Sequence, residues 1–194
     1  MKWITGGVTA AAGFRASGVS AGLKRSRKPD MSLVVSKTLA VCAGTLTTNR
    51  IKAAPVLISR QRLKAGRAKA VLLNSGCANC LTGEQGMRDA LALGRSAAKA
   101  LGMAERHILL ASTGMIGRRL PVPRMQQVIP ELVARLGRRG HHEAALGMLT
   151  TDAMAKEAAV EGRIGNRLCR LGGMAKGAGM IAPSMATMLC VLTT

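Results

Sequence analysis

Short hydrophobic runs bounded by turn residues recur along the chain and predict a series of β-strands. The run at 68–73 ends in Asn74-Ser75-Gly76, which is typical of a buried strand that leads into a turn. A second run at 107–111 is followed by a loop of hydroxyl and glycine residues. Further strands are expected within 8–19, at 31–35, at 40–46, and in a hairpin formed by 158–161 and 167–171.

Helical periodicity marks the segments between these runs. Apolar residues spaced by three or four positions predict a helix up to Leu101, and Thr82 and Gln85 at its start have the spacing of a capping box. A second helix is predicted from 120–123 to Gly137, and a short third one at 144–149. The segment His141-His142-Glu143 is interpreted as a surface turn, because adjacent side chains on a helix diverge too far to hold a metal.

Strands that alternate with helices, and that are apolar enough to be covered on both faces, favour an α/β fold, here an α+β layered sandwich. The chain has 194 residues, of which 48% are hydrophobic, so it can bury a sizeable core. Only 1% are aromatic, so that core must consist of aliphatic side chains and methionine. In the glycine-rich final stretch, Thr187 opens an apolar run that is predicted to be a buried strand.

The formal net charge of +20 would by itself suggest nucleic acid or an anionic surface as partner. The basic residues are scattered, however, and the chain lacks aromatic platforms on which bases could stack. We therefore expect no nucleic acid as partner. We also expect no membrane, because Pro183 and several hydroxyl residues interrupt the uncharged end of the chain.

Five cysteines, an odd number, occur without a convincing secretory signal, which fits a reducing compartment and a cytoplasmic protein. Cys77 and Cys80 form a C-x-x-C pair, but a second pair or a suitably spaced histidine is missing from the sequence. We therefore expect no metal site and no bound cofactor.

Three segments carry candidate chemistry. Residues 47–56 have little periodicity, which indicates a site loop. Ser112-Thr113-Gly114 can direct a hydroxyl and backbone N–H groups toward one point, as an oxyanion hole requires. A single hydroxyl at the start of a strand, that of Thr187, suits a nucleophile, although spacing alone favours a packed core threonine there and a solvated charge at Lys176.

Residues 176–189, Lys-Gly-Ala-Gly-Met-Ile-Ala-Pro-Ser-Met-Ala-Thr-Met-Leu, resemble the self-cleavage and nucleophile motif of the bifunctional ornithine acetyltransferase/glutamate N-acetyltransferase family of arginine biosynthesis. One short motif would mean little, but five in family order are specific. The other four are Thr-Thr-Asn-Arg at 47–50, Asn-Ser-Gly at 74–76, Ser-Thr-Gly at 112–114 and Thr-Thr-Asp at 150–152. The chain departs from the family pattern at Cys77, where an asparagine is usual.

The resemblance implies that the chain cuts itself between Ala186 and Thr187, and that Thr187 becomes the nucleophile at the start of a second chain. It implies oxyanion stabilisation by Thr113 and Gly114. Substrate contacts are implied for Lys176, for Thr187 and for one of two neighbouring hydroxyls, those of Thr150 and Thr151. Residues 1–186 would form the first chain, and 187–194 would begin the second.

The implied fold is DmpA/ArgJ-like, with helices outside packed sheets, and the second chain completes it, in a heterotetramer. The implied activity is acetyl transfer from N-acetylornithine to glutamate through an acetyl-threonine, with acetyl-CoA as an optional co-substrate. Two alternatives stay open. One is a related self-processing amidase or aminopeptidase, which hydrolyses instead of transferring, and the other is a basic binding protein without catalysis.

Overall fold

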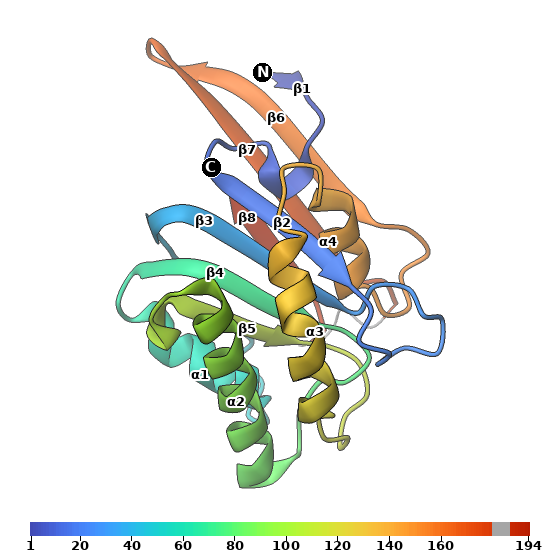
Figure 1. The fold of residues 1–194 in the computed structure, drawn as a ribbon. Helices are drawn as coiled ribbons and strands as arrows, with labels where there is room; N and C mark the ends of the chain where they lie inside the picture. Colours follow the sequence, from blue (N-terminus) through green and yellow to red (C-terminus); the bar gives the residue numbers. More distant parts are fainter. Residues whose placement is uncertain (180–186) are drawn as a thin grey trace.

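Two four-stranded sheets carry the fold in the computed structural model, which describes residues 1–179 and 187–194 (Figure 1). The first sheet has the strand order β2-β3-β4-β5, antiparallel except that β5 joins β4 in parallel. The second sheet has the order β1-β6-β7-β8 and is antiparallel throughout. The strands are β1 Lys2–Trp3, β2 Phe14–Val19, β3 Met31–Val41, β4 Arg67–Asn74, β5 Ile108–Ser112, β6 Lys156–Ile164, β7 Arg167–Lys176 and β8 Leu189–Thr193.

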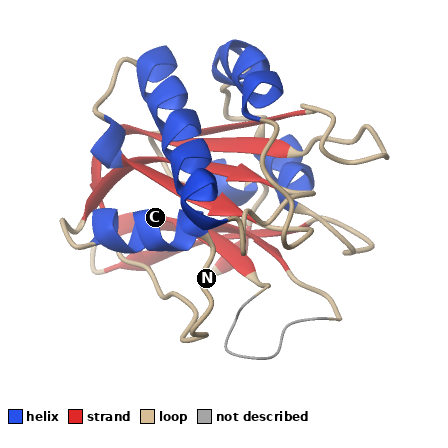
Figure 2. Cartoon of the chain, turned by 90° about the horizontal axis from the view of Figure 1, so that it is seen from below, coloured by secondary structure: helices blue, strands red, loops and turns tan. Residues whose placement is uncertain are grey.

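The connection between the parallel strands β4 and β5 contains helix α2, because parallel neighbours need a long crossover. Helices α1, α2 and α3 share one hydrophobic core with the first sheet, so they cover the same face of it. Figure 2 shows the helices packed against the strands. The helices are α1 Ala54–Leu63, α2 Gly83–Leu101, α3 Val122–Ala134 and α4 His141–Met148, with 3-10 turns at Gly7–Thr9 and Glu105–His107.

Side chains of the first sheet alternate between two cores, as the pleat of a strand dictates. Leu33 and Leu72 lie in the core under α1, α2 and α3. Val34 and Leu73 pack instead with Met174 of β7 and with the buried face of α4. Helix α4 therefore lies in the layer between the two sheets, while the other three helices lie outside.

Helix α4 approaches the first sheet closely because glycines occupy the contact points. A Cβ atom at Gly18 would lie 2.1 Å from the Glu143 carbonyl oxygen, and one at Gly147 would lie 2.1 Å from Ser32 Oγ. The Ser32 hydroxyl donates to the Ala144 carbonyl oxygen at 2.7 Å. These contacts fix α4, and the loop that follows it, against β2 and β3.

Most predicted elements are confirmed, namely α2, α3, α4, β4, β5 and the hairpin of β6 and β7. The two short strands expected at 31–35 and 40–46 are instead one strand, β3. Its pairing with β4 shifts register between Val35 and Ala40, which explains the break in the hydrophobic pattern. Residues 42–46 form a loop.

Helix α1 is an element that the sequence pattern did not predict. Its apolar and basic residues do not segregate onto separate faces, so the usual periodicity is missing. Tertiary contacts hold it instead. Ser59 Oγ donates to the Leu110 carbonyl oxygen at 2.7 Å and accepts the Leu110 N–H at 2.8 Å, which ties the helix to β5.

Two local predictions are wrong. Thr82 does not cap α2, because its hydroxyl donates to Asn79 Oδ1 at 2.7 Å. The run after Thr187 is not a buried strand either, because β8 lies at the edge of the second sheet in the described part of the chain and alternates between exposed and covered residues. Leu192 is 66% exposed.

The expected surface turn at residues 141–143 is in fact the first turn of α4. The Nδ1 atoms of His141 and His142 lie 2.6 and 2.8 Å from the two carboxylate oxygens of Glu157 on β6. Burial raises the pKa of Glu157, but hydrogen bonds from both imidazoles outweigh it and bring that pKa below its usual value. The contact joins α4 to the second sheet.

Among residues 1–179 and 187–194, no group of three His, Cys, Asp or Glu side chains is placed to hold a metal ion. None of the helices in this part of the chain is long and apolar enough to cross a membrane.

Asp30, between β2 and β3, provides a test of the fold. Its buried carboxylate accepts the backbone N–H groups of Ala21 and Leu23, each at 2.6 Å, and that of Lys24 at 3.2 Å. Asp30→Ala leaves these donors unpaired and should lower the free energy of unfolding of the full-length protein by about 2–4 kcal/mol. Asp30→Asn keeps one oxygen and should lose less. Urea unfolding followed by circular dichroism measures both, and equal losses would contradict this role.

Candidate functional site

The buried ammonium of Lys176 lies at the centre of the candidate site, at the end of β7. The residue is 4% exposed. Its Nζ donates to Thr150 Oγ1 at 2.7 Å, to Thr113 Oγ1 at 3.1 Å and to the Thr187 carbonyl oxygen at 3.2 Å. The Lys176 side chain thus contacts three other predicted site residues, each from a separate segment.

The environment of Lys176 changes its acidity. Burial lowers the pKa of the ammonium, the nearby Asp152 carboxylate raises it, and the charge of Lys156 lowers it further, with a net decrease. A buried ammonium needs hydrogen-bond acceptors, since an unpaired charge inside a protein is very costly. The two hydroxyls and the Thr187 carbonyl supply them.

The loop of Thr113 and Gly114 follows β5 and is held tightly. The Thr113 N–H donates to the Asn74 carbonyl oxygen at 3.0 Å. Gly114 has a φ of +126°, and a Cβ there would lie 2.4 Å from the backbone carbon of Gly76. Only glycine fits this position. Among the described residues, the Gly114 N–H forms no backbone hydrogen bond, so it is available to an oxyanion.

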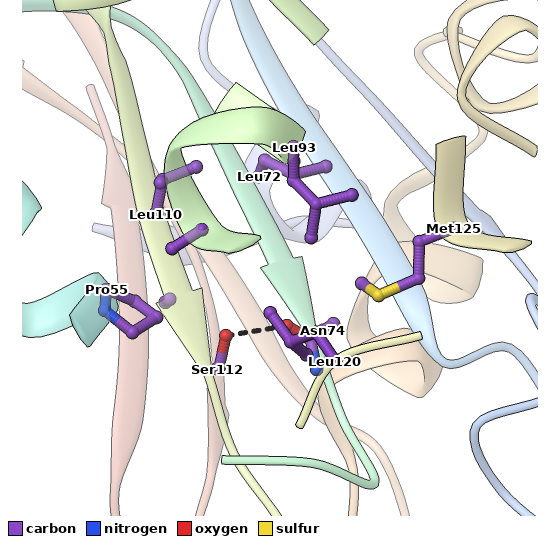
Figure 3. Close-up of a pocket in the computed structure, with 10 residues that line it drawn as sticks. Pro55, Leu72, Asn74, Leu93, Leu110, Ser112, Leu120 and Met125 are labelled. Carbon is purple, nitrogen blue, oxygen red and sulfur yellow. Dashed lines mark hydrogen bonds between the residues drawn. The ribbon is translucent and has the colours of Figure 1, made fainter. Parts of the chain in front are cut away.

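Asn74 lies beside Ser112, where this loop begins (Figure 3). Its Oδ1 accepts the Ser112 hydroxyl at 2.6 Å, and its Nδ2 donates to the Cys77 carbonyl oxygen at 2.9 Å. The side chain thereby joins the ends of β4 and β5. The apolar void above it has a volume of about 10 Å³, which is room for one water molecule and not for a substrate.

Thr187 lies two residues before β8. Its Oγ1 is buried and has no hydrogen-bond partner among the described residues. Buried hydroxyls are normally paired, so an unpaired one suggests a chemical role. Its predicted cleavage partner, Ala186, lies outside the described residues.

A cavity of about 660 Å³ contains Thr113, Gly114 and Thr187 in its wall. The loop expected to belong to a site also contributes, through Thr47 and Asn49. This volume suits a small-molecule substrate. The cavity therefore joins the predicted nucleophile and the predicted oxyanion donors.

The structure distinguishes two neighbouring hydroxyls that the sequence left equivalent. Thr150 contacts Lys176, whereas Thr151 is exposed to solvent. Sequence reasoning also missed Asp152 and Lys156, which hold the residue after Lys176. Asp152 belongs to the Thr-Thr-Asp motif, but Lys156 lies in no motif, so only the three-dimensional fold could reveal it.

In the C-x-x-C pair, Cys77 is a buried thiol held by a hydrogen bond. The thiol donates to the Arg118 carbonyl oxygen at 2.9 Å. Burial raises its pKa, which keeps it in the unreactive thiol form. All five cysteines are free.

The family model described as "ArgJ family" matches residues 15–194 of this chain. The chain belongs to the ArgJ family. Two relatives are arginine biosynthesis bifunctional proteins ArgJ. The protein of Thermosynechococcus vestitus is 50% identical over 98% of this chain and 46% of its own length. That of Symbiobacterium thermophilum is 47% identical over 100% of this chain and 49% of its own length.

This ArgJ family chain spans about half the length of the curated relatives that it matches. Its fold agrees with solved ArgJ structures. The arginine biosynthesis bifunctional protein ArgJ of Bacillus halodurans matches with a TM-score of 0.89 and 32% identity over 97% of each chain. Ornithine acetyltransferase of Mycobacterium tuberculosis, solved with ornithine, matches with a TM-score of 0.87 and 41% identity over 94% of this chain and 98% of that chain. The predicted ArgJ-like layered fold is confirmed.

Gly114 offers a test of the ArgJ loop with a matched control. Gly114→Ala combines left-handed backbone strain with a clash against Gly76, so it should lower the free energy of unfolding by about 2–5 kcal/mol. Gly117 also has a positive φ, +77°, but open space around its Cβ position. Gly117→Ala should therefore cost only about 1–2 kcal/mol. Chemical denaturation of the full-length variants measures the difference, and equal costs would disprove the close approach.

Proposed function

We propose that the complete polypeptide cuts itself between Ala186 and Thr187 and then transfers an acetyl group from N-acetylornithine to glutamate. The observation that carries this proposal is the unpaired, buried hydroxyl of Thr187 in one cavity with Thr113 and Gly114. Membership of the ArgJ family supports the same assignment, as does the likeness to an ornithine acetyltransferase solved with ornithine.

Self-cleavage begins when Thr187 Oγ attacks the carbonyl carbon of Ala186. The C–N bond breaks as a C–O bond forms, so the acyl group moves from nitrogen to oxygen and the α-amine of Thr187 is released. Water then hydrolyses the ester, which leaves the carboxylate of Ala186 and the hydroxyl of Thr187. The ammonium of Lys176, at 3.2 Å from the Thr187 carbonyl oxygen, holds the nucleophilic residue in place.

Acetyl transfer uses the groups that this cut creates. The α-amine of Thr187 takes the hydroxyl proton, since this amine titrates near neutrality. The hydroxyl oxygen attacks the acetyl carbonyl, and ornithine leaves with the proton on its amine. Glutamate then attacks the acetyl-threonine ester through its own amine, which forms N-acetylglutamate and restores the hydroxyl.

The oxyanion of each tetrahedral intermediate is stabilised by Thr113 and Gly114. Thr113 Oγ1 already accepts a hydrogen bond from Lys176, so its own proton is free to point into the cavity. The Gly114 N–H is the second donor. Groups fixed before the reaction stabilise developing charge at little reorganisation cost.

A second chain from the same precursor, assembled as a heterotetramer, is the partner that we propose. The outer face of the second sheet is apolar and open in this chain, with Trp3 78% exposed and Leu171 and Leu192 beside it in one groove. Apolar surface of this kind marks an interface. The matched chains of the solved structures have about the length of this one, although curated relatives are about twice as long, which supports a family precursor divided in two. With five free cysteines, a reducing cytoplasm is the proposed location.

Thr187→Ala tests the nucleophile. The full-length variant should stay as one polypeptide in intact mass measurements and should form no N-acetylglutamate, whereas the wild type should yield a chain beginning at Thr187. Thr194→Ala, an exposed threonine in the same segment, is the control and should process normally. A Thr187→Ala precursor that still splits would disprove the mechanism.

The same assay separates transfer from hydrolysis. With N-acetylornithine and glutamate present, N-acetylglutamate should form faster than free acetate. More acetate than N-acetylglutamate would instead indicate the self-processing amidase alternative. Replacing N-acetylornithine by acetyl-CoA tests whether the thioester is a second acetyl donor.

Thr150→Val and Thr151→Val form a matched pair. Thr150→Val removes the 2.7 Å contact with the Lys176 ammonium, and hydrogen bonds to charged groups contribute about 1.5–3 kcal/mol. We expect kcat/KM of the processed enzyme to fall about tenfold or more. Thr151→Val changes an exposed side chain and should keep kcat/KM within about twofold. Steady-state kinetics on both variants checks this, and equal values would mean that the Thr150 contact is unimportant.

A further inference from the structure

The residue immediately after Lys176 is held through both of its backbone polar groups. The Gly177 N–H donates to Asp152 Oδ1 at 2.8 Å, and the Gly177 carbonyl oxygen accepts from Lys156 Nζ at 2.7 Å. Lys156 also forms an ion pair with the same Asp152 oxygen. These three contacts close a ring around one residue, Gly177.

This ring is built into the fold. Lys156 is the first residue of β6 and pairs with Ala175 in β7, so the strand register brings it beside Gly177. The side chain of Asp152 is 0% exposed, and its Oδ2 is buried without a partner among the described residues. Gly177 has a φ of +145°, a backbone conformation that residues other than glycine rarely adopt. Burying a carboxylate is costly, so Asp152 is expected to have a role beyond that of a surface ion pair.

The position of the ring in the sequence suggests its purpose. Lys176 holds the Thr187 carbonyl oxygen, and its own neighbour Gly177 is held by Asp152 and Lys156. The predicted cleavage bond lies in residues 177–187, here called the cleavage segment. Asp152 and Lys156 anchor one end of this segment, and Lys176 anchors the other. An intramolecular attack depends strongly on how well the reacting atoms are oriented.

We propose that Asp152 and Lys156 form a clamp on Gly177 that positions Lys176 and the start of the cleavage segment, and so sets the rate of self-cleavage. This inference rests on the proposed function, because it assigns positioning residues to the cut at Ala186–Thr187. Asp152 acts in two ways, through its hydrogen bond to the Gly177 N–H and through its negative charge near the Lys176 ammonium.

The charged groups around Lys176 give the clamp a pH signature. Among the described residues, Asp152 raises the pKa of Lys176 and Lys156 lowers it, while burial lowers it most. Removing the Asp152 charge must therefore lower the pKa of Lys176. The ammonium is then lost at a lower pH, so the alkaline loss of cleavage rate should begin earlier. Removing the Lys156 charge should shift that pKa upward.

The test uses the full-length precursor made by cell-free translation, with the fraction of chain beginning at Thr187 followed over time by mass spectrometry. Asp152→Ala should slow the cleavage roughly tenfold to a hundredfold, as expected for a misplaced reacting group. Asp152→Asn keeps an acceptor for Gly177 and should slow it less, with the alkaline limb of the rate profile moved to lower pH. Lys156→Met should also slow cleavage, with the limb moved to higher pH.

Glu131→Ala is the matched control, because Glu131 forms an exposed ion pair of the same sequence spacing with Arg135. It should cleave at the wild-type rate. If Asp152→Ala does not fold, Asp152→Asn and Lys156→Met decide. Wild-type rates and an unchanged pH profile in both would overturn the clamp. An uncut wild-type precursor, or a cut Thr187→Ala precursor, would overturn the proposed function instead, so the two failures are distinguishable.

Discussion

A buried positive charge organises this chain. The Lys176 ammonium at the end of β7 accumulates acceptors from three other segments, the hydroxyls of Thr113 and Thr150 and the carbonyl of Thr187. Each acceptor reduces the cost of keeping the charge away from water, which would otherwise amount to several kcal/mol. The compensation of one charge therefore requires the first sheet, the loop after α4 and the start of β8 to meet at one point.

The scaffold behind that point is built mainly from backbone groups and small residues. Asn74 joins the ends of two parallel strands, and glycines at positions 18 and 147 allow α4 to lie directly against the first sheet. Aromatic residues, which commonly brace an active site, are nearly absent from the sequence. Close backbone approach gives the precision that large side chains provide elsewhere.

The sequence predicted the periodic elements well, and it predicted the site through motifs rather than through periodicity. Helix α2 has a strong amphipathic pattern and was expected, whereas α1 has none and forms because Ser59 bonds to β5. The buried strand expected after Thr187 is an edge strand in the described part of the chain. An apolar run indicates a strand, but it does not indicate where in the sheet that strand lies. Lys156 reaches the site only through the β6–β7 register, which no local pattern encodes.

The pairing of β7 with β8 bears on what happens after a cut before Thr187. Five residue pairs, from Gly172 with Thr193 to Lys176 with Leu189, join the strand before the cleavage segment to the strand after it. A cut before Thr187 would leave the β7–β8 hydrogen bonds intact, so the chain that begins at Thr187 would stay paired with the second sheet. A cut at the proposed position would free an amino terminus, and the β7–β8 pairing would hold the two products together.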